Sequence, residues 1–73
     1  MSVRLLYQRR DESGWQILHE FSTEDEGRAR AVELSGSAQF RARPSWDSIS
    51  GRPARGFEYQ RGDETWLVEV DDS

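Results

Sequence analysis

The stretch VRLLYQRRDESGWQILHEF, residues 3–21, predicts two β-strands joined by a turn. Residues 3–9 and 15–21 alternate side chains between two faces, and a period of two is typical of strands. The intervening RDESG, residues 10–14, is a turn cluster in which Gly14 suits the left-handed conformation of a three-residue hairpin loop. The opening third of the chain therefore predicts a β-hairpin with one core face.

A three-residue loop also predicts the register of this hairpin. Paired positions then sum to 24, so that apolar residues face apolar ones and arginine faces glutamate, as cross-strand pairing favours. The predicted pairs are Val3–Phe21, Arg4–Glu20, Leu5–His19, Leu6–Leu18 and Tyr7–Ile17.

A helix is predicted directly after the hairpin. Three carboxylates at positions 24–26 suit the positive end of a helix dipole, and the helix should end near Leu34 or Ser35, with Gly36 as its stop. Small apolar residues such as Ala29 and Ala31 would let this helix lie close to a sheet. Two capping boxes are available, Thr23 with Glu26 and Ser22 with Asp25.

The rest of the chain predicts three more strands. Residues 38–43 alternate and are followed by Pro44, which supplies no donor to a strand ladder. Residues 44–56 predict a long loop rich in Pro, Gly and Ser. A second hairpin should join residues 57–60 to 65–70, before an acidic tail at 71–73. A four-residue loop predicts the pairs Phe57–Val68, Glu58–Leu67, Tyr59–Trp66 and Gln60–Thr65.

The predicted fold class is therefore α+β, with the order β-β-α-β-β-β. One helix should pack on one face of a mainly antiparallel sheet as a two-layer domain. The 73 residues are expected to form a single domain, 1–73, because no repeat and no second composition class is present. Eight aromatic residues favour a folded chain over a disordered one.

Composition excludes several classes of protein. The absence of cysteine excludes a disulfide framework and a thiolate metal site. No apolar run is long enough to span a bilayer, and the first residues lack the apolar region of a signal peptide. We therefore expect a cytoplasmic protein with no membrane association.

Catalytic chemistry is not indicated by the sequence. His19 is the only histidine, and the register places it beside Leu5, where a structural role is the simpler interpretation. No metal-binding spacing and no phosphate-binding glycine loop occurs. The expectation is a protein with no catalytic residues, no metal and no cofactor.

Three sets of residues are candidate binding surfaces, each with a bland alternative. The acidic set would form a ridge on the last hairpin that mimics phosphates, or merely a solubilising face. The arginine set, in a segment of positive charge, would bind nucleic acid, or merely be a solvated strand end and loop. The leucine set would form an interface on the sheet face away from the helix, or merely be scattered leucines. The acidic set is Glu58, Asp63, Glu64, Glu69 and Asp71; the arginine set is Arg41, Arg43, Trp46, Arg52 and Arg55; the leucine set is Leu6, Leu18 and Leu67.

The leading hypothesis is a non-catalytic protein-binding module that uses the acidic set. In size and in its net charge of −4 the chain resembles small phage and mobile-element inhibitors such as anti-CRISPR proteins, though no motif carries this resemblance. That resemblance implies an inhibitor of a nucleic-acid-handling complex. The alternatives are a nucleic-acid-binding module and a homodimeric structural module.

Overall fold

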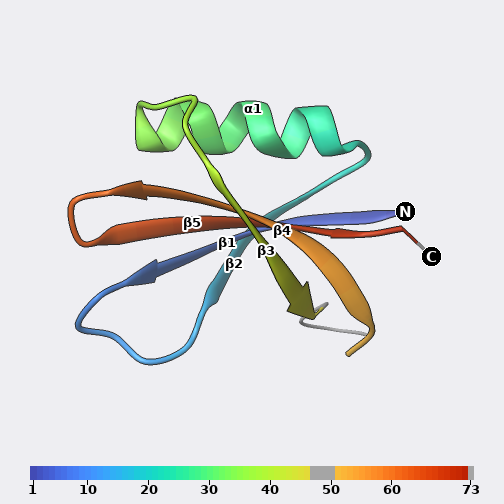
Figure 1. The fold of residues 1–73 in the computed structure, drawn as a ribbon, viewed down its shortest axis with the longest axis horizontal. Coiled ribbons are helices and arrows are strands. Elements are labelled where there is room, and N and C mark those ends of the chain that lie inside the picture. The colour runs from blue at the N-terminus through green and yellow to red at the C-terminus, as the bar shows by residue number, and fades with distance from the viewer. Residues whose placement is uncertain (47–50, 73) are drawn as a thin grey trace.

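One antiparallel sheet and one helix make up the fold. The computed structural model describes residues 1–46 and 51–72, and its helix lies across one face of the sheet (Figure 1). The sheet has the strand order β2-β1-β5-β4-β3, which confirms the predicted α+β class and element order. The elements are β1 (Ser2–Arg9), β2 (Gln16–Phe21), α1 (Glu24–Ser35), β3 (Arg41–Trp46), β4 (Pro53–Arg61) and β5 (Glu64–Asp71).

Helix α1 begins with one of the two predicted capping boxes. The hydroxyl oxygen of Thr23 accepts a hydrogen bond from the backbone N–H of Glu26 at 3.2 Å and donates one to its carboxylate at 3.0 Å. Gly36 ends the helix in the left-handed conformation, with φ of 73°, and its N–H donates to the carbonyl of Val32. The capping box is therefore Thr23 with Glu26, and the predicted stop at Gly36 is confirmed.

The helix approaches the sheet through its smallest residues. Its buried positions are Gly27, Ala31 and Ser35, whereas Ala29, which was predicted to lie against the sheet, is exposed. A Cβ atom at position 27 would lie 2.7 Å from a methyl carbon of Val3. Since real Cβ atoms do not come so close, this glycine sets how near the helix backbone lies to β1.

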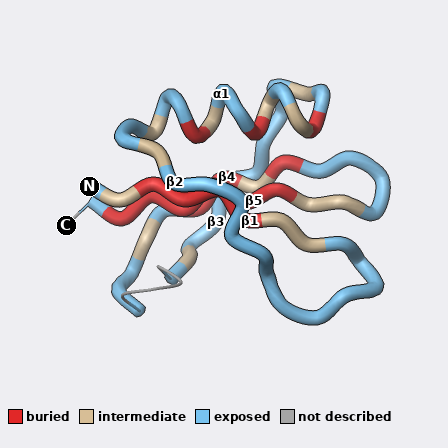
Figure 2. Tube along the Cα trace, turned by 180° about the vertical axis from the view of Figure 1, so that it is seen from behind, coloured by how far each residue is buried: buried red, intermediate tan, exposed pale blue. Residues whose placement is uncertain are grey.

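The core lies between α1 and the sheet. Figure 2 shows the buried positions concentrated in the central strands and on the underside of the helix. Strand β1 pairs with β5 and so joins the two predicted hairpins into one sheet. The buried cluster consists of Val3, Leu5, Ala31, Phe57, Tyr59, Trp66, Val68 and Val70.

Arg28 closes one side of this core, a role that the sequence did not indicate. Its guanidinium carbon lies 4.4 Å from the ring centre of Phe40 and 4.5 Å from that of Phe57. Its Nε also donates a hydrogen bond to the Tyr59 hydroxyl at 3.2 Å. These contacts hold an arginine over aromatic rings, where the cation is attracted to the π-face.

The hairpin of β4 and β5 has the predicted register. All four predicted pairs occur, and a further pair joins Arg61 to Glu64. The loop is therefore two residues shorter than predicted, with Gly62 at a positive φ of 62°. A two-residue turn of this kind favours glycine because its backbone enters the left-handed region.

The hairpin of β1 and β2 departs from the predicted register at one point. The pairs Val3–Phe21, Arg4–Glu20 and Leu5–His19 are confirmed, but the register then shifts by one residue. Leu6 pairs with Ile17, and Tyr7 pairs with Gln16, so the predicted partners of Leu6 and Tyr7 were wrong. Leu18 is the extra residue of a β-bulge. The residues of the second strand that precede Leu18 therefore lie on the face opposite to the predicted one.

Strand β3 was predicted three residues too early. It runs from Arg41 to Trp46 and contains Pro44, which was expected to end it. The proline is tolerated because β3 is an edge strand. Along one side of an edge strand the backbone N–H groups have no neighbouring strand to bond to, so a residue without an N–H costs little there. Much of the predicted 44–56 loop is consequently strand, while residues 47–50 of that loop and residue 73 of the predicted tail lie outside the described residues.

Candidate binding site on the open face of the sheet

The sheet face that α1 leaves uncovered, here called the open face, lies between two arms. The turn end of the β1–β2 hairpin, and the end of β3 with the start of β4, extend from the sheet on the side away from the helix (Figure 2). The first arm is the turn end of the β1–β2 hairpin and carries Trp15. The second arm is formed by the end of β3 and the start of β4 and carries Trp46.

Both tryptophans line one hollow, here called the two-tryptophan hollow, of about 510 Å³. Leu6 and Leu67, which are cross-strand partners, form its floor and are 2% and 3% exposed. Ile17 stands beside Trp15, and residues 43–46 of β3 line the other side. Trp15, Ile17 and Trp46 remain 36%, 44% and 67% exposed, so much of the apolar lining faces solvent.

The leucine set is only partly brought together. Leu6 and Leu67 meet as predicted, but Leu18 does not join them, because the bulge turns it toward the helix side. There it lines a separate hollow with Leu5 and Leu34. Ile17 takes its place on the open face. The sequence contained one signal for this arrangement. Leu5 and Leu6 are consecutive, so β1 has an apolar residue on each face, and a strand beside it is expected to offer apolar residues on both faces too.

Charged residues of the open face lie in pairs, and two of them, Arg43 and Glu69, line the hollow. Arg4 contacts Glu20 at 3.1 Å, and Arg4 also faces the buried Glu69 across β1 and β5. Two further ion pairs on this face join Arg43 to Glu58 at 2.7 Å and Arg52 to Asp71 at 3.4 Å. No buried side-chain nitrogen or oxygen atom among the described residues is left without a hydrogen-bond partner.

The acidic set does not form the predicted open ridge. Glu69 and Asp71 are 5% and 2% exposed, since they lie in the central strand β5 between neighbours on both sides. Asp63 contacts Arg9 at 3.8 Å. Glu64 accepts hydrogen bonds from the Tyr7 hydroxyl at 2.6 Å and from Arg61, and these bonds hold the pKa of Glu64 below its usual value. Arginine or tyrosine partners thus accompany these carboxylates.

The arginine set is divided between the two faces. Arg41, Arg43 and Arg52 lie on the side of the hollow, while Arg55 bonds to Glu24 at the start of α1 and to Asp72. Those two carboxylates raise the pKa of Arg55. Arg41 alone in the set makes no ion pair with any residue of the described ranges. The predicted cluster therefore does not form one basic surface.

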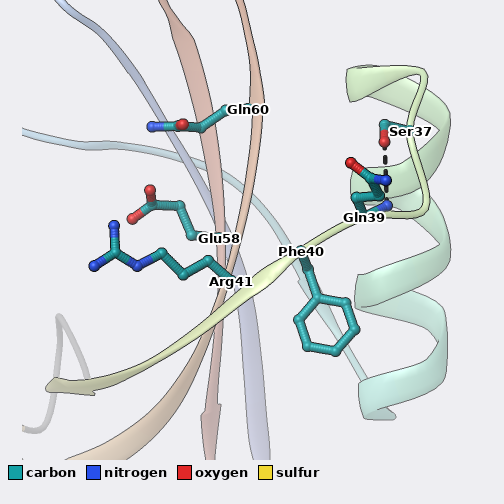
Figure 3. A pocket seen from close by; sticks show the side chains of 6 residues that line it. All are labelled: Ser37, Gln39, Phe40, Arg41, Glu58 and Gln60. Atoms are coloured by element: carbon teal, nitrogen blue, oxygen red, sulfur yellow. Dashed lines mark hydrogen bonds between the residues drawn. The ribbon is translucent and has the colours of Figure 1, made fainter.

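A second hollow, of about 240 Å³, lies along the start of β3. In Figure 3, Arg41, Glu58 and Gln60 project together to one side, whereas Phe40 turns toward the helix. The backbone N–H of Gln39 donates a hydrogen bond to the Ser37 hydroxyl at 3.1 Å. The residues that line this hollow are mainly polar. One of them, Glu58, already forms an ion pair with Arg43.

His19 lies exposed on the edge strand β2, with its ring 4.7 Å from that of Phe21 in an edge-on contact. Within residues 1–46 and 51–72, no hydrogen bond joins it to a serine or a carboxylate. The same residues contain no group of three histidines or carboxylates arranged for a metal ion. They also contain no helix long and apolar enough to cross a membrane.

Neither protein-family models, nor curated proteins, nor solved structures match this chain.

Proposed function

We propose that this protein is a non-catalytic protein-binding module that holds its partner in the two-tryptophan hollow. The observation that carries the proposal is the position of the exposed apolar residues. Three of the six large apolar residues exposed in the described ranges, Trp15, Ile17 and Trp46, line this one hollow. Contiguous apolar surface marks interaction sites, and tryptophan is enriched at the centres of protein interfaces.

The proposed binding surface is the two-tryptophan hollow and not the acidic set that the sequence favoured. Arginine partners at Glu58 and Asp71 and the burial of Glu69 leave little free negative charge on the last hairpin. An inhibitor that mimics phosphates would need such charge on its surface. Inhibition of a nucleic-acid-handling complex and a cytoplasmic location therefore stay predictions, supported by small size, charge and composition alone.

Nucleic-acid binding is the second candidate, and one observation favours it. Arg41 has no ion pair among the described residues, and the exposed Trp46 on the same strand offers a ring on which a base can stack. An interaction of this kind would weaken steeply with salt because phosphate contacts release counterions. The pairing of Arg43, Arg52 and Arg55 with carboxylates lowers the positive charge available for it.

The test uses two neighbouring residues that the bulge places on opposite faces. Ile17→Glu puts a charge into the hollow, and Leu18→Glu puts the same charge on the helix side at a similar exposure of 39%. Tagged wild-type protein and both variants are used to capture partners from nuclease-treated lysate that also contains untagged copies of this chain. The proposal expects bound protein with the wild type and with Leu18→Glu, and its loss with Ile17→Glu.

Two results would contradict this proposal. Capture that persists with Ile17→Glu would show that the hollow is not the binding site. Captured material that disappears after nuclease treatment, and whose binding falls with salt, would favour the nucleic-acid candidate.

A further inference from the structure

We propose that the partner held in the two-tryptophan hollow is a second copy of this chain. The open faces of two copies would pack against each other around a two-fold axis, with the helices on the outside. The layers would then follow the order helix, sheet, sheet, helix, and each sheet would have both faces covered. This inference rests on the proposed function, since it names the partner for the same surface.

The charge of the open face suits an identical partner. The described residues of this face carry four arginines and four carboxylates, so their formal charges cancel. The rest of the chain therefore carries the whole net charge of −4. Two open faces can therefore meet without net repulsion between their charges. The charged residues are Arg4, Arg41, Arg43, Arg52, Glu20, Glu58, Glu69 and Asp71.

The arrangement of the two arms supports the same conclusion. Trp46 is 67% exposed, so its own chain covers only a third of it, and it lies beside a hollow of about 510 Å³ whose lining includes Leu6, Ile17 and Leu67. In a two-fold interface each contact occurs twice, because the same patch is presented by both subunits. Trp46 of each copy would thus contact the hollow of the other, and two indole rings would be buried at once.

The open face is also large enough for a specific interface. The Cα atoms of the whole molecule span 32 Å and 19 Å in the two directions across this face, so the outline of the face is at most about 600 Å². The smallest specific interfaces bury about 500 Å² on each partner. A dimer of this kind would fall in the lower part of the range, and its affinity would depend on the two tryptophans and Ile17.

The experiment is sedimentation equilibrium of the purified chain over a wide range of concentrations. The monomer has a mass of 8.5 kDa, and the wild type is expected to approach twice this mass as concentration rises. Ile17→Glu should raise the dissociation constant of the dimer by about thirtyfold or more, as expected for the loss of an interface hot spot. Leu18→Glu is the matched control and should dimerise like the wild type.

Circular dichroism of each variant shows whether it is folded. If Ile17→Glu does not fold, Trp46→Arg replaces it, because a residue 67% exposed contributes little to the fold of its own chain. A wild type that stays at 8.5 kDa overturns the second-copy proposal but leaves the proposed function standing, since capture of another protein can still depend on Ile17. A dimer that Leu18→Glu dissociates and Ile17→Glu does not would place the contact on β2 or the helix side, and would also overturn it.

Discussion

The sheet face under α1 packs mainly apolar side chains, whereas the described residues of the open face set two leucines among four arginines and four carboxylates. On the covered face a helix lies so close that position 27 has no room for a side chain. On the open face the two leucines are shielded by side chains of the arms that stay partly exposed themselves. We infer from this difference that the covered face stabilises the fold, while the open face leaves apolar residues available for binding.

Leu5 and Leu6 are neighbours in β1 and give the strongest test of this comparison. Both are almost fully buried, but Leu5 lies in the core beneath α1 and Leu6 lies on the floor of the hollow. Leu5→Ala should cost about 4 kcal/mol, because it removes a side chain from the core cluster beneath α1, and Leu6→Ala only about 2 kcal/mol, because the arms can close over the gap. Urea unfolding at low protein concentration measures both. Equal losses would mean that the two faces are packed equally tightly.

Gly56 and Gly27 test the same comparison with a smaller effect. A Cβ atom at position 56 would lie 2.9 Å from the backbone oxygen of Arg43, so β3 itself would have to move. Gly56→Ala should therefore cost about 2 kcal/mol and also weaken dimer formation. Gly27→Ala strains the methyl groups of Val3 and Val68, but alanine favours a helix by about 1 kcal/mol over glycine, which leaves a net loss of about 1 kcal/mol. A larger loss at Gly27 than at Gly56 would contradict this order.

The smallest expected effect concerns a hydrogen bond that depends on pH. The Tyr7 hydroxyl donates to Glu64 and helps to hold its pKa below the usual value near 4.5. A lowered pKa stabilises the folded state above pH 4.5, and this stabilisation is lost as pH falls through the lower folded value. Tyr7→Phe should therefore reduce the urea midpoint at pH 7, and the difference from the wild type should shrink as pH falls below 4.5.

Tyr59→Phe is the matched control for that measurement. It removes a hydroxyl that accepts a hydrogen bond from Arg28, whose pKa is raised and whose charge persists throughout this range. The loss should thus be the same at pH 7 and near pH 3. If Tyr7→Phe also showed no dependence on pH, the bond to Glu64 would not be formed in solution.

Several features could be predicted from residues close together in the chain. A capping box within residues 22–26, the stop at Gly36 and the register of the β4–β5 hairpin all follow from contacts within a few residues. Such contacts form between groups that the backbone already holds near each other. Short patterns therefore indicate them without knowledge of the rest of the fold.

The candidate site could be predicted only in part. Leu6 and Leu67 were correctly predicted to lie together. The predicted register put Leu18 on the open face and Ile17 on the helix side, and the structure shows the reverse. The alternation of residue types along 15–21 does not distinguish a regular strand from a bulged one, because a bulge is defined by the pairing with the partner strand. Only the pairing of β2 with β1 shows that one residue is extra. Likewise, Glu69 and Asp71 form an acidic pattern in the sequence, and their burial follows from the strands on either side of β5.

By itself the sequence determined the element order, the helix stop at Gly36 and the pairings of the β4–β5 hairpin, because these depend on local backbone preferences and on short loops. The tertiary structure alone decided the pairing of β1 with β5, the bulge at Leu18 and the placement of Trp15 and Trp46 at the same hollow. These join residues far apart in the chain, and their free energy comes from burial that exists only once the whole sheet has formed.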